Sequence, residues 1–258
     1  MKRCLPGVVA LAFPWIVASA SAAEAPARIY TRTPNPTVAG LYDWNGAYVG
    51  ANGGYASSRK CWDVVALSST PIAAFREGCH DAVGATLGGQ FGYRWQKSNW
   101  VFGLEAQLNI GDIKGSQVTA FPTALGGVPI SVSNRSRVAG FGLYTGQAGY
   151  AWNNILWYVK GGYAATADYY EDFLTFKGAL VDSAREIRGG ATVGTGVEVA
   201  FSTDWSVAVE YDHLFMGTQD LTFRSRGGAN FVTHRIRQDA DILTARLNYR
   251  FPWPLIKY

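Results

Sequence analysis

Hydrophobic and polar residues alternate along most of the chain after Trp44. Alternation with a period of two places successive side chains on opposite faces of a β-strand. The most regular segments carry an apolar residue at nearly every second position, and less regular ones are rich in glycine and aromatic residues. The pattern predicts eight strands, at residues 45–57, 82–95, 100–110, 137–151, 156–167, 188–201, 205–212 and 242–251.

Short and long connections alternate strictly between these predicted strands. The short ones are residues 96–99, 152–154 and 202–204, and the long ones are about 58–81, 111–136, 168–187 and 216–239. Such an arrangement is expected when every tight turn faces the periplasm and every long loop faces outward. The sequence therefore predicts an all-β fold, an eight-stranded antiparallel transmembrane β-barrel with short periplasmic turns and four long extracellular loops.

The charged residues decide which face of each strand points inward. A water-soluble barrel would expose its polar face, but this face carries too little charge for a solvent surface. If the polar face instead lines a narrow lumen, its four acidic residues can pair with four basic residues. The expected lumen ion-pair network comprises Arg94, Glu105, Lys160, Glu198, Glu210, Asp212, Arg246 and Arg250.

The composition agrees with a membrane barrel. The chain is 48% hydrophobic with 16% charged residues, yet no apolar run beyond its first 23 residues reaches the ~20 residues that a membrane-spanning helix needs. Its 30 glycines suit tightly curved strands. The aromatic residues gather at strand ends, where membrane barrels carry two interfacial girdles. The predicted girdle residues are Trp44, Tyr55, Tyr93, Trp95, Trp100, Tyr150, Trp152, Trp157, Trp205 and Phe251.

The beginning of the chain has the features of a secretory signal peptide. Lys2 and Arg3 precede an apolar stretch that ends in small residues, which predicts a signal peptide at 1–22. Residues 23–43 are rich in proline without periodicity and are expected to form a periplasmic linker, followed by the barrel domain at 44–258. Removal of the signal lowers the net charge from +4 to +2. This weak charge argues against a nucleic-acid partner.

Cys61 and Cys79 are the two cysteines that remain after cleavage. In an exported protein such a pair is expected to form a disulfide, here joining positions 18 residues apart in a surface loop. A metal site that uses His80 is the weaker alternative, because the further ligand spacing is missing.

Seven segments resemble the small porin-like outer-membrane immunogenic proteins of alphaproteobacteria in order and spacing. This resemblance covers about 44–251 and implies an OmpA-type eight-stranded barrel at the cell surface, without a known catalytic centre; some relatives bind haem or are described as porins. The segments are WNGAYVGANGGY at 44–55, GGQFGYRW at 88–95, WVFGLE at 100–105, YVKGGY at 158–163, GTGVEVAF at 194–201, WSVAVEY at 205–211 and ARLNYRF at 245–251.

Two positions depart from the family pattern. Relatives usually carry a stretch like Arg-Gly-Arg in the fourth strand, where this chain has Thr145, Gly146 and Gln147. The chain also continues past its last strand. The signal for insertion by the barrel assembly machinery, expected to include Leu247, Tyr249 and Phe251, therefore ends either at Phe251 or at Tyr258.

Candidate chemistry is sparse, since the chain has only three histidines. A lipid-modifying barrel enzyme would need a histidine and a hydroxyl near the outer rim, and His213 with Ser225 is the nearest match. Glu105 and Glu198 could form an acid and base pair, but ion pairs with lumen arginines explain them better. We therefore predict no catalytic, cofactor or metal site.

The predicted function is that of a non-enzymatic structural surface protein with a lumen largely filled by side chains. The alternatives are a small porin or a haem-binding surface receptor, with haem or small solutes as ligands. The basic residues of the outer loops also suit the phosphates of lipopolysaccharide, so outer-membrane lipids are expected partners.

Overall fold

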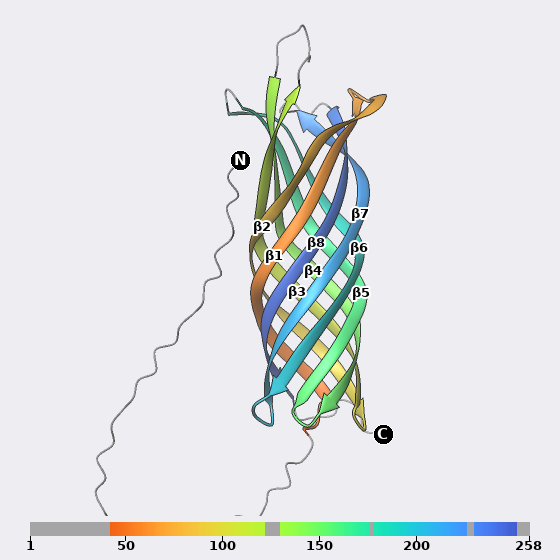
Figure 1. The fold of residues 1–258 in the computed structure, drawn as a ribbon, viewed down its shortest axis with the longest axis vertical. Coiled ribbons are helices and arrows are strands. Elements are labelled where there is room, and N and C mark those ends of the chain that lie inside the picture. Colours follow the sequence, from red (N-terminus) through yellow and green to blue (C-terminus); the bar gives the residue numbers. More distant parts are fainter. Residues whose placement is uncertain (1–41, 122–129, 176–177, 226–229, 252–258) are drawn as a thin grey trace, which may run out of the picture. The chain divides into compact units, whose positions relative to one another are not determined.

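A computed structural model describes residues 42–121, 130–175, 178–225 and 230–251. The predicted signal peptide and nearly all of the predicted linker lie outside these residues. Eight antiparallel strands follow one another around a closed barrel, with β8 paired to β1 (Figure 1). The described residues contain no helix long and apolar enough to cross a bilayer. The strands are β1 (Gly46–Leu67), β2 (Thr70–Lys97), β3 (Trp100–Phe121), β4 (Ile130–Trp152), β5 (Ile155–Leu174), β6 (Ala179–Ala200), β7 (Trp205–Ser225) and β8 (Asn230–Arg250).

The outward face is apolar where the alternation predicted it. Leu104, Leu108 and Ile110 on β3 are 61–73% exposed, and their polar neighbours Glu105 and Asn109 are buried inside. A water-soluble barrel would show the reverse arrangement. The predicted fold class, an eight-stranded transmembrane barrel, is confirmed.

The strands are much longer than predicted, because most of each expected long loop is strand. A tilted strand crosses a bilayer in about 9–11 residues, whereas these strands have 20–28. The expected loop at 58–81 is a β-hairpin that turns at Ser68 and Ser69, both with positive φ. The dipeptides Asn-Gly and Asp-Gly are typical of tight hairpin turns, but Ser-Ser is not. The sequence therefore did not indicate a turn here. The strands are therefore longer than a bilayer requires, and the excess continues the barrel wall on its outer side, away from the short turns (Figure 1).

Cys61 and Cys79 are directly paired positions in this hairpin, with Cα atoms 4.0 Å apart. The predicted disulfide is confirmed. It joins two strands of the part of the barrel wall that exceeds the length a bilayer requires, the outer extension. The two cysteines therefore do not lie in an irregular loop. The link holds the β1–β2 hairpin together in the region where neither strand has lipid around it.

The barrel interior is layered, and the residues of β1 that face inward trace the layers from the periplasmic end outward. Tyr48 belongs to a charged layer, Asn52 to an amide layer and Ala56 to an apolar layer. Lys60 then forms a second charged layer and Trp62 an aromatic layer. Buried side chains of these five kinds thus follow one another along the described part of the lumen.

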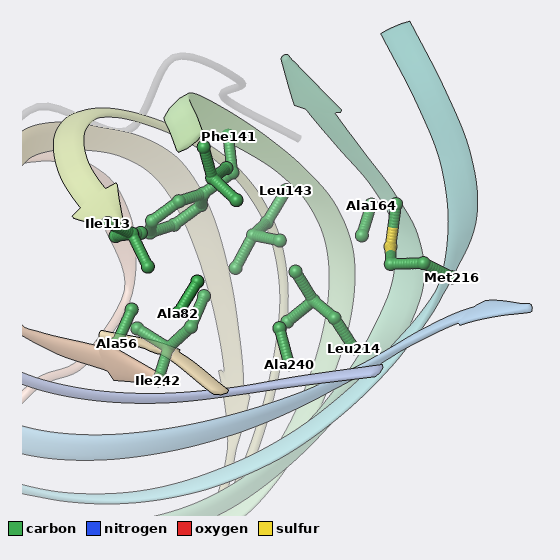
Figure 2. Close-up of a cluster of buried hydrophobic side chains, with 11 residues drawn as sticks. Ala56, Ala82, Ile113, Phe141, Leu143, Ala164, Leu214, Met216, Ala240 and Ile242 are labelled. Carbon is green, nitrogen blue, oxygen red and sulfur yellow. The ribbon is translucent and has the colours of Figure 1, made fainter. Parts of the chain in front are cut away.

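The apolar layer was not expected from the sequence. Figure 2 shows its side chains converging from different strands into the lumen. Phe141 and Leu143 are the largest side chains that β4 contributes to this layer, and both are almost fully buried. Phe141 and Leu143 lie in a predicted strand whose alternation is weak. The sequence therefore does not determine which face of this strand points into the lumen. The layer comprises Ala56, Ala82, Ile113, Val138, Phe141, Leu143, Ala164, Leu214, Met216, Ala240 and Ile242.

Trp44 is not a girdle residue. Its side chain is buried at the periplasmic end of the lumen, with Val101, Leu156 and Tyr158 in the same cluster. The Arg94 guanidinium lies 5.6 Å from the centre of its ring. Trp44 precedes β1 by two residues, so the strand alternation does not determine its direction.

The predicted insertion-signal residues lie at the periplasmic end of β8. Leu247 and Phe251 are each 42% exposed, and the rings of Tyr249 and Phe251 are in contact, with centroids 5.2 Å apart. Tyr258, the other candidate for the final aromatic residue, lies outside the described residues. The outward position of Leu247 and Phe251 follows from the regular alternation of β8.

Candidate functional site

The charged layer at the periplasmic side joins four strands. Arg246 of β8 contacts Glu210 Oε2 through Nη1 and lies 2.5 Å from Glu105 Oε2 through Nη2. Lys160 Nζ lies 2.6 Å from Glu210, 3.3 Å from Asp212 and 3.4 Å from Glu105. All five side chains are at most 2% exposed. Because β3, β5, β7 and β8 each supply a member, the network ties opposite walls of the barrel together.

Two tyrosines and a separate ion pair complete this layer. Tyr48 donates a hydrogen bond of 2.7 Å to Glu105, and Tyr158 donates one of 2.6 Å to Glu210. Arg94 Nη2 lies 2.7 Å from Glu198 Oε2, and its guanidinium stacks 4.3 Å from the centre of the Tyr48 ring. The structure thus places both predicted carboxylates, Glu105 and Glu198, in ion pairs with basic residues.

Arg250 lies outside the lumen network, contrary to the expectation from the sequence. Its guanidinium donates hydrogen bonds to the carbonyl oxygens of Asn45 and Thr203 at the periplasmic rim. Asp43 and Asp204 lie 3.7 and 4.0 Å away. Arg250 is the last residue of β8, where the strand has already reached the rim.

Amide side chains fill the next layer. Gln90 accepts a hydrogen bond from Asn52 and donates one to Asn248, both of 2.7 Å. Asn109 donates one of 2.6 Å to Asn52. Gln147 of β4 donates a hydrogen bond of 3.0 Å to the Tyr48 hydroxyl. Gln147 thereby adds a neutral donor to the tyrosine that binds Glu105.

A second set of buried charges lies in the outer extension. The sequence did not predict that these residues face the lumen. Lys60 Nζ is 2.5 Å from Asp168, and Arg188 is 3.0 Å from Glu186; the Lys60, Asp168 and Arg188 side chains are fully buried. Lys60, Asp168 and Glu186 fall in segments that the alternation predicts to be loops. The signal that could have found them is the continuation of the period-two register past each predicted strand end.

An acidic cluster lies beyond these pairs. His234 Nδ1 is 3.1 Å from Glu77 Oε2, and His234 Nε2 is 3.6 Å from Asp172 Oδ2. Asp182 is buried beside Asp172. In the described parts of the chain, no group of His, Cys, Asp and Glu has an arrangement suited to a metal ion. The carboxyl groups of Glu77 and Asp172 thus lie on either side of the His234 ring in the outer extension.

Burial raises the pKa of Asp172 well above its usual range, and the neighbouring Asp182 and Glu77 raise it further. The pKa of Asp182 is also raised, mainly by burial. Both groups bind protons more tightly in the folded state than in the unfolded state. Their contribution to stability is therefore full below the unfolded pKa of about 3.9 and is lost as the pH rises through the raised folded pKa.

The Asp172→Asn variant should consequently have a more stable outer extension than the wild type at pH 8. Hydrogen–deuterium exchange of peptides from the outer ends of β5 and β6 tests this, with both proteins compared at the same pH. We expect slower exchange in the variant at pH 8 and a smaller difference at pH 5. Faster exchange in the variant at pH 8 would contradict the account.

The candidate pair for a lipid-modifying enzyme does not come together. His213 and Ser225 lie twelve positions apart on the same strand, β7, which corresponds to roughly 40 Å at about 3.3 Å per residue. His213 instead lies on the outer surface, where its Nδ1 is 2.7 Å from Asp241 Oδ1. The other two histidines, His80 of β2 and His234 of β8, are buried.

Comparison with known proteins agrees with this architecture. Residues 9–251 match the model of the outer membrane protein beta-barrel domain family. The 31 kDa outer-membrane immunogenic proteins of Brucella melitensis and Brucella suis are each 28% identical over 203 residues, covering 72% of this chain and 78% of the relative. The resemblance noted in the sequence is confirmed.

Two solved structures are also similar in fold. The outer membrane protease OmpT from Escherichia coli is 10% identical to this chain and superposes with a TM-score of 0.49. The match covers 80% of this chain and 97% of the OmpT chain. The outer membrane protein OprG from Pseudomonas aeruginosa has 13% identity and a TM-score of 0.47, covering 80% and 96%. The family match and the closed barrel lead to one conclusion: this chain belongs to the outer membrane β-barrel domain family and lies in the outer membrane of a Gram-negative bacterium.

Proposed function

We propose that this protein is a non-enzymatic, structural surface protein whose lumen is closed to solutes. The observation that carries the proposal is the succession of buried ion pairs, amides and apolar side chains inside the barrel. An eight-stranded barrel has an interior just wide enough for side chains. Here the apolar layer would expel water, and the ion pairs on either side of it would hold the wall rigid.

The separation of His213 from Ser225 supports the non-enzymatic part of the proposal, because a nucleophile and its base must lie within hydrogen-bond reach. The ion pairs of Glu105 and Glu198 support it as well. Each carboxylate is held by a cation and by further donors, which favours a stiffening role over proton transfer.

Conductance in planar lipid bilayers tests the closed lumen and separates it from the small-porin alternative. We expect no reproducible open state above leak for the wild type. A Phe141→Ala/Leu143→Ala variant should admit water through the apolar layer and conduct, whereas Leu108→Ala on the lipid face should behave as the wild type. An open wild-type state whose conductance shifts in Glu105→Gln would overturn the proposal.

A further inference from the structure

An apolar groove runs along the lipid-facing surface of β3, β4 and β5. It has a volume of about 680 Å³. Its floor consists of Gly140, Gly142, Ala165 and Ala167, and large side chains rise on both sides of it. Leu108 and Ile110 form one wall, while Ile187 of β6, 81% exposed, stands at the other. The groove interrupts the belt of bulky side chains that faces lipid elsewhere.

A row of basic residues closes the outer end of this groove. The ladder pairs Ile110 with Gly140, Gly140 with Ala167, and Ala167 with Ile187 across four strands. In the next outward row, it pairs Lys114 with Arg137, Arg137 with Tyr169, and Tyr169 with Arg185. Three cations and an aromatic ring thus lie next to the outer end of the groove.

The cations are accessible and already arranged for an anion. The Lys114 and Arg137 side chains are 60% and 52% exposed, and Asp112 holds them together through contacts of 2.6 and 2.9 Å. The Arg185 guanidinium lies 5.1 Å from the centre of the Tyr169 ring. One carboxylate beside three cations leaves the row positive. Guanidinium groups bind phosphate oxygens in pairs, which makes them well suited to a phosphorylated headgroup.

The opposite wall of the barrel lacks this arrangement at its outer rim. There β8 carries the exposed Asp241 and the partly exposed Asp239, and Arg237 lies 3.5 Å from Asp239. These carboxylates would repel a phosphate. The exposed arginines of β8 thus have carboxylate partners, Asp220 for Arg235 and Asp239 for Arg237, whereas the row beside the groove has one carboxylate for three cations.

We propose that the groove and the basic row form one binding site for the lipid A part of lipopolysaccharide. An acyl chain would lie in the groove, and a phosphate of the headgroup would contact Lys114, Arg137 and Arg185. The site faces the outer leaflet, because it lies at the end of the barrel opposite the short periplasmic turns. Selectivity comes mainly from the phosphate, since lipid tails are as apolar as the groove itself. The inference is independent of whether the lumen conducts.

Native mass spectrometry of the full-length mature protein in detergent, titrated with diphosphorylated lipid A, tests the site. We expect wild-type barrels to retain one lipid A. An Arg137→Gln/Arg185→Gln variant should bind about tenfold more weakly or worse, because charge-assisted hydrogen bonds to the phosphate are lost. An Ala165→Leu/Ala167→Leu variant, which fills the groove, should also bind more weakly.

Matched changes on the opposite wall serve as controls. Arg237→Gln removes an exposed cation, and Ala245→Leu enlarges an exposed alanine of β8, so both should bind lipid A as the wild type does. Heat-modifiable gel mobility would show that every variant is folded. Unchanged binding by either site variant would overturn the two-part site. Displacement of lipid A by an equal concentration of phosphatidylglycerol would overturn the assignment to lipopolysaccharide.

Discussion

Replacing Arg246 by Met should lower the free energy of unfolding of the barrel by about 3–5 kcal/mol, the usual cost of breaking a buried ion pair from one side. Its guanidinium contacts both Glu105 and Glu210, and all three side chains are at most 2% exposed. Without it, Lys160 would be the one cation of this network left for Glu105, Glu210 and Asp212. Urea unfolding in detergent micelles, followed by gel mobility, measures the loss.

The same substitution at Arg235 is a matched control. Arg235 makes two contacts to Asp220, of 2.7 and 2.8 Å, but both side chains are nearly half exposed. Exposed pairs contribute little to stability, so Arg235→Met should leave the unfolding midpoint unchanged. Adding Glu105→Gln to Arg246→Met should recover part of the lost stability. Equal losses at Arg246 and Arg235 would show that burial is not the source of the effect.

Replacing Gly54 by Ala should weaken the seam where the first and last strands close the barrel. Gly54 of β1 pairs with Thr244 of β8. A methyl group there would collide with the Leu243 carbonyl oxygen and lie 2.8 Å from Thr244 Cα, and both are backbone atoms that cannot turn away. We expect a loss of about 1–3 kcal/mol in the free energy of unfolding, as for other overpacked sites. The urea midpoint and the heat-modifiable fraction both report it.

The neighbouring Gly53 provides the comparison. A methyl group on Gly53 would meet Leu87 Cδ1 at 3.5 Å, an ordinary van der Waals contact on the lipid side. Gly53→Ala should therefore be neutral, or stabilising by about 0.4–1 kcal/mol through the unfolded chain. If the two variants unfold alike, the close approach at Gly54 does not limit closure of the seam.

Regular alternation predicted the eight strands and the inward faces of the most regular ones. The disulfide was predicted separately, from the pair of cysteines in an exported chain. Glu105, Glu198, Glu210 and Arg246 point into the lumen because each lies in a strand whose apolar partners occupy every second position. The prediction failed at the ends of that register. Arg250 reaches the periplasmic rim, and Trp44, two residues before β1, turns into the lumen.

The sequence did not predict the strands of the outer extension, for a different reason. Its strands have no lipid around them, so their outward positions accept charged residues and the alternation becomes weak. Arg59 and Asp81 face outward there, while Lys60 faces inward to reach Asp168. The sequence of a segment with charges on both faces predicts a loop. Its backbone nevertheless pairs continuously with the neighbouring strands.

What the sequence by itself determined was the part of the barrel in contact with lipid, because the bilayer forces apolar residues outward at every second position. Only the tertiary structure decided which charges pair, since Arg246 and Glu105 are separated by 141 residues and meet through closure of the barrel. It also decided the groove, whose floor and basic row come from neighbouring strands in one particular register. Register across a ladder depends on the turns and bulges that set it, and the alternation of a single strand does not contain that information.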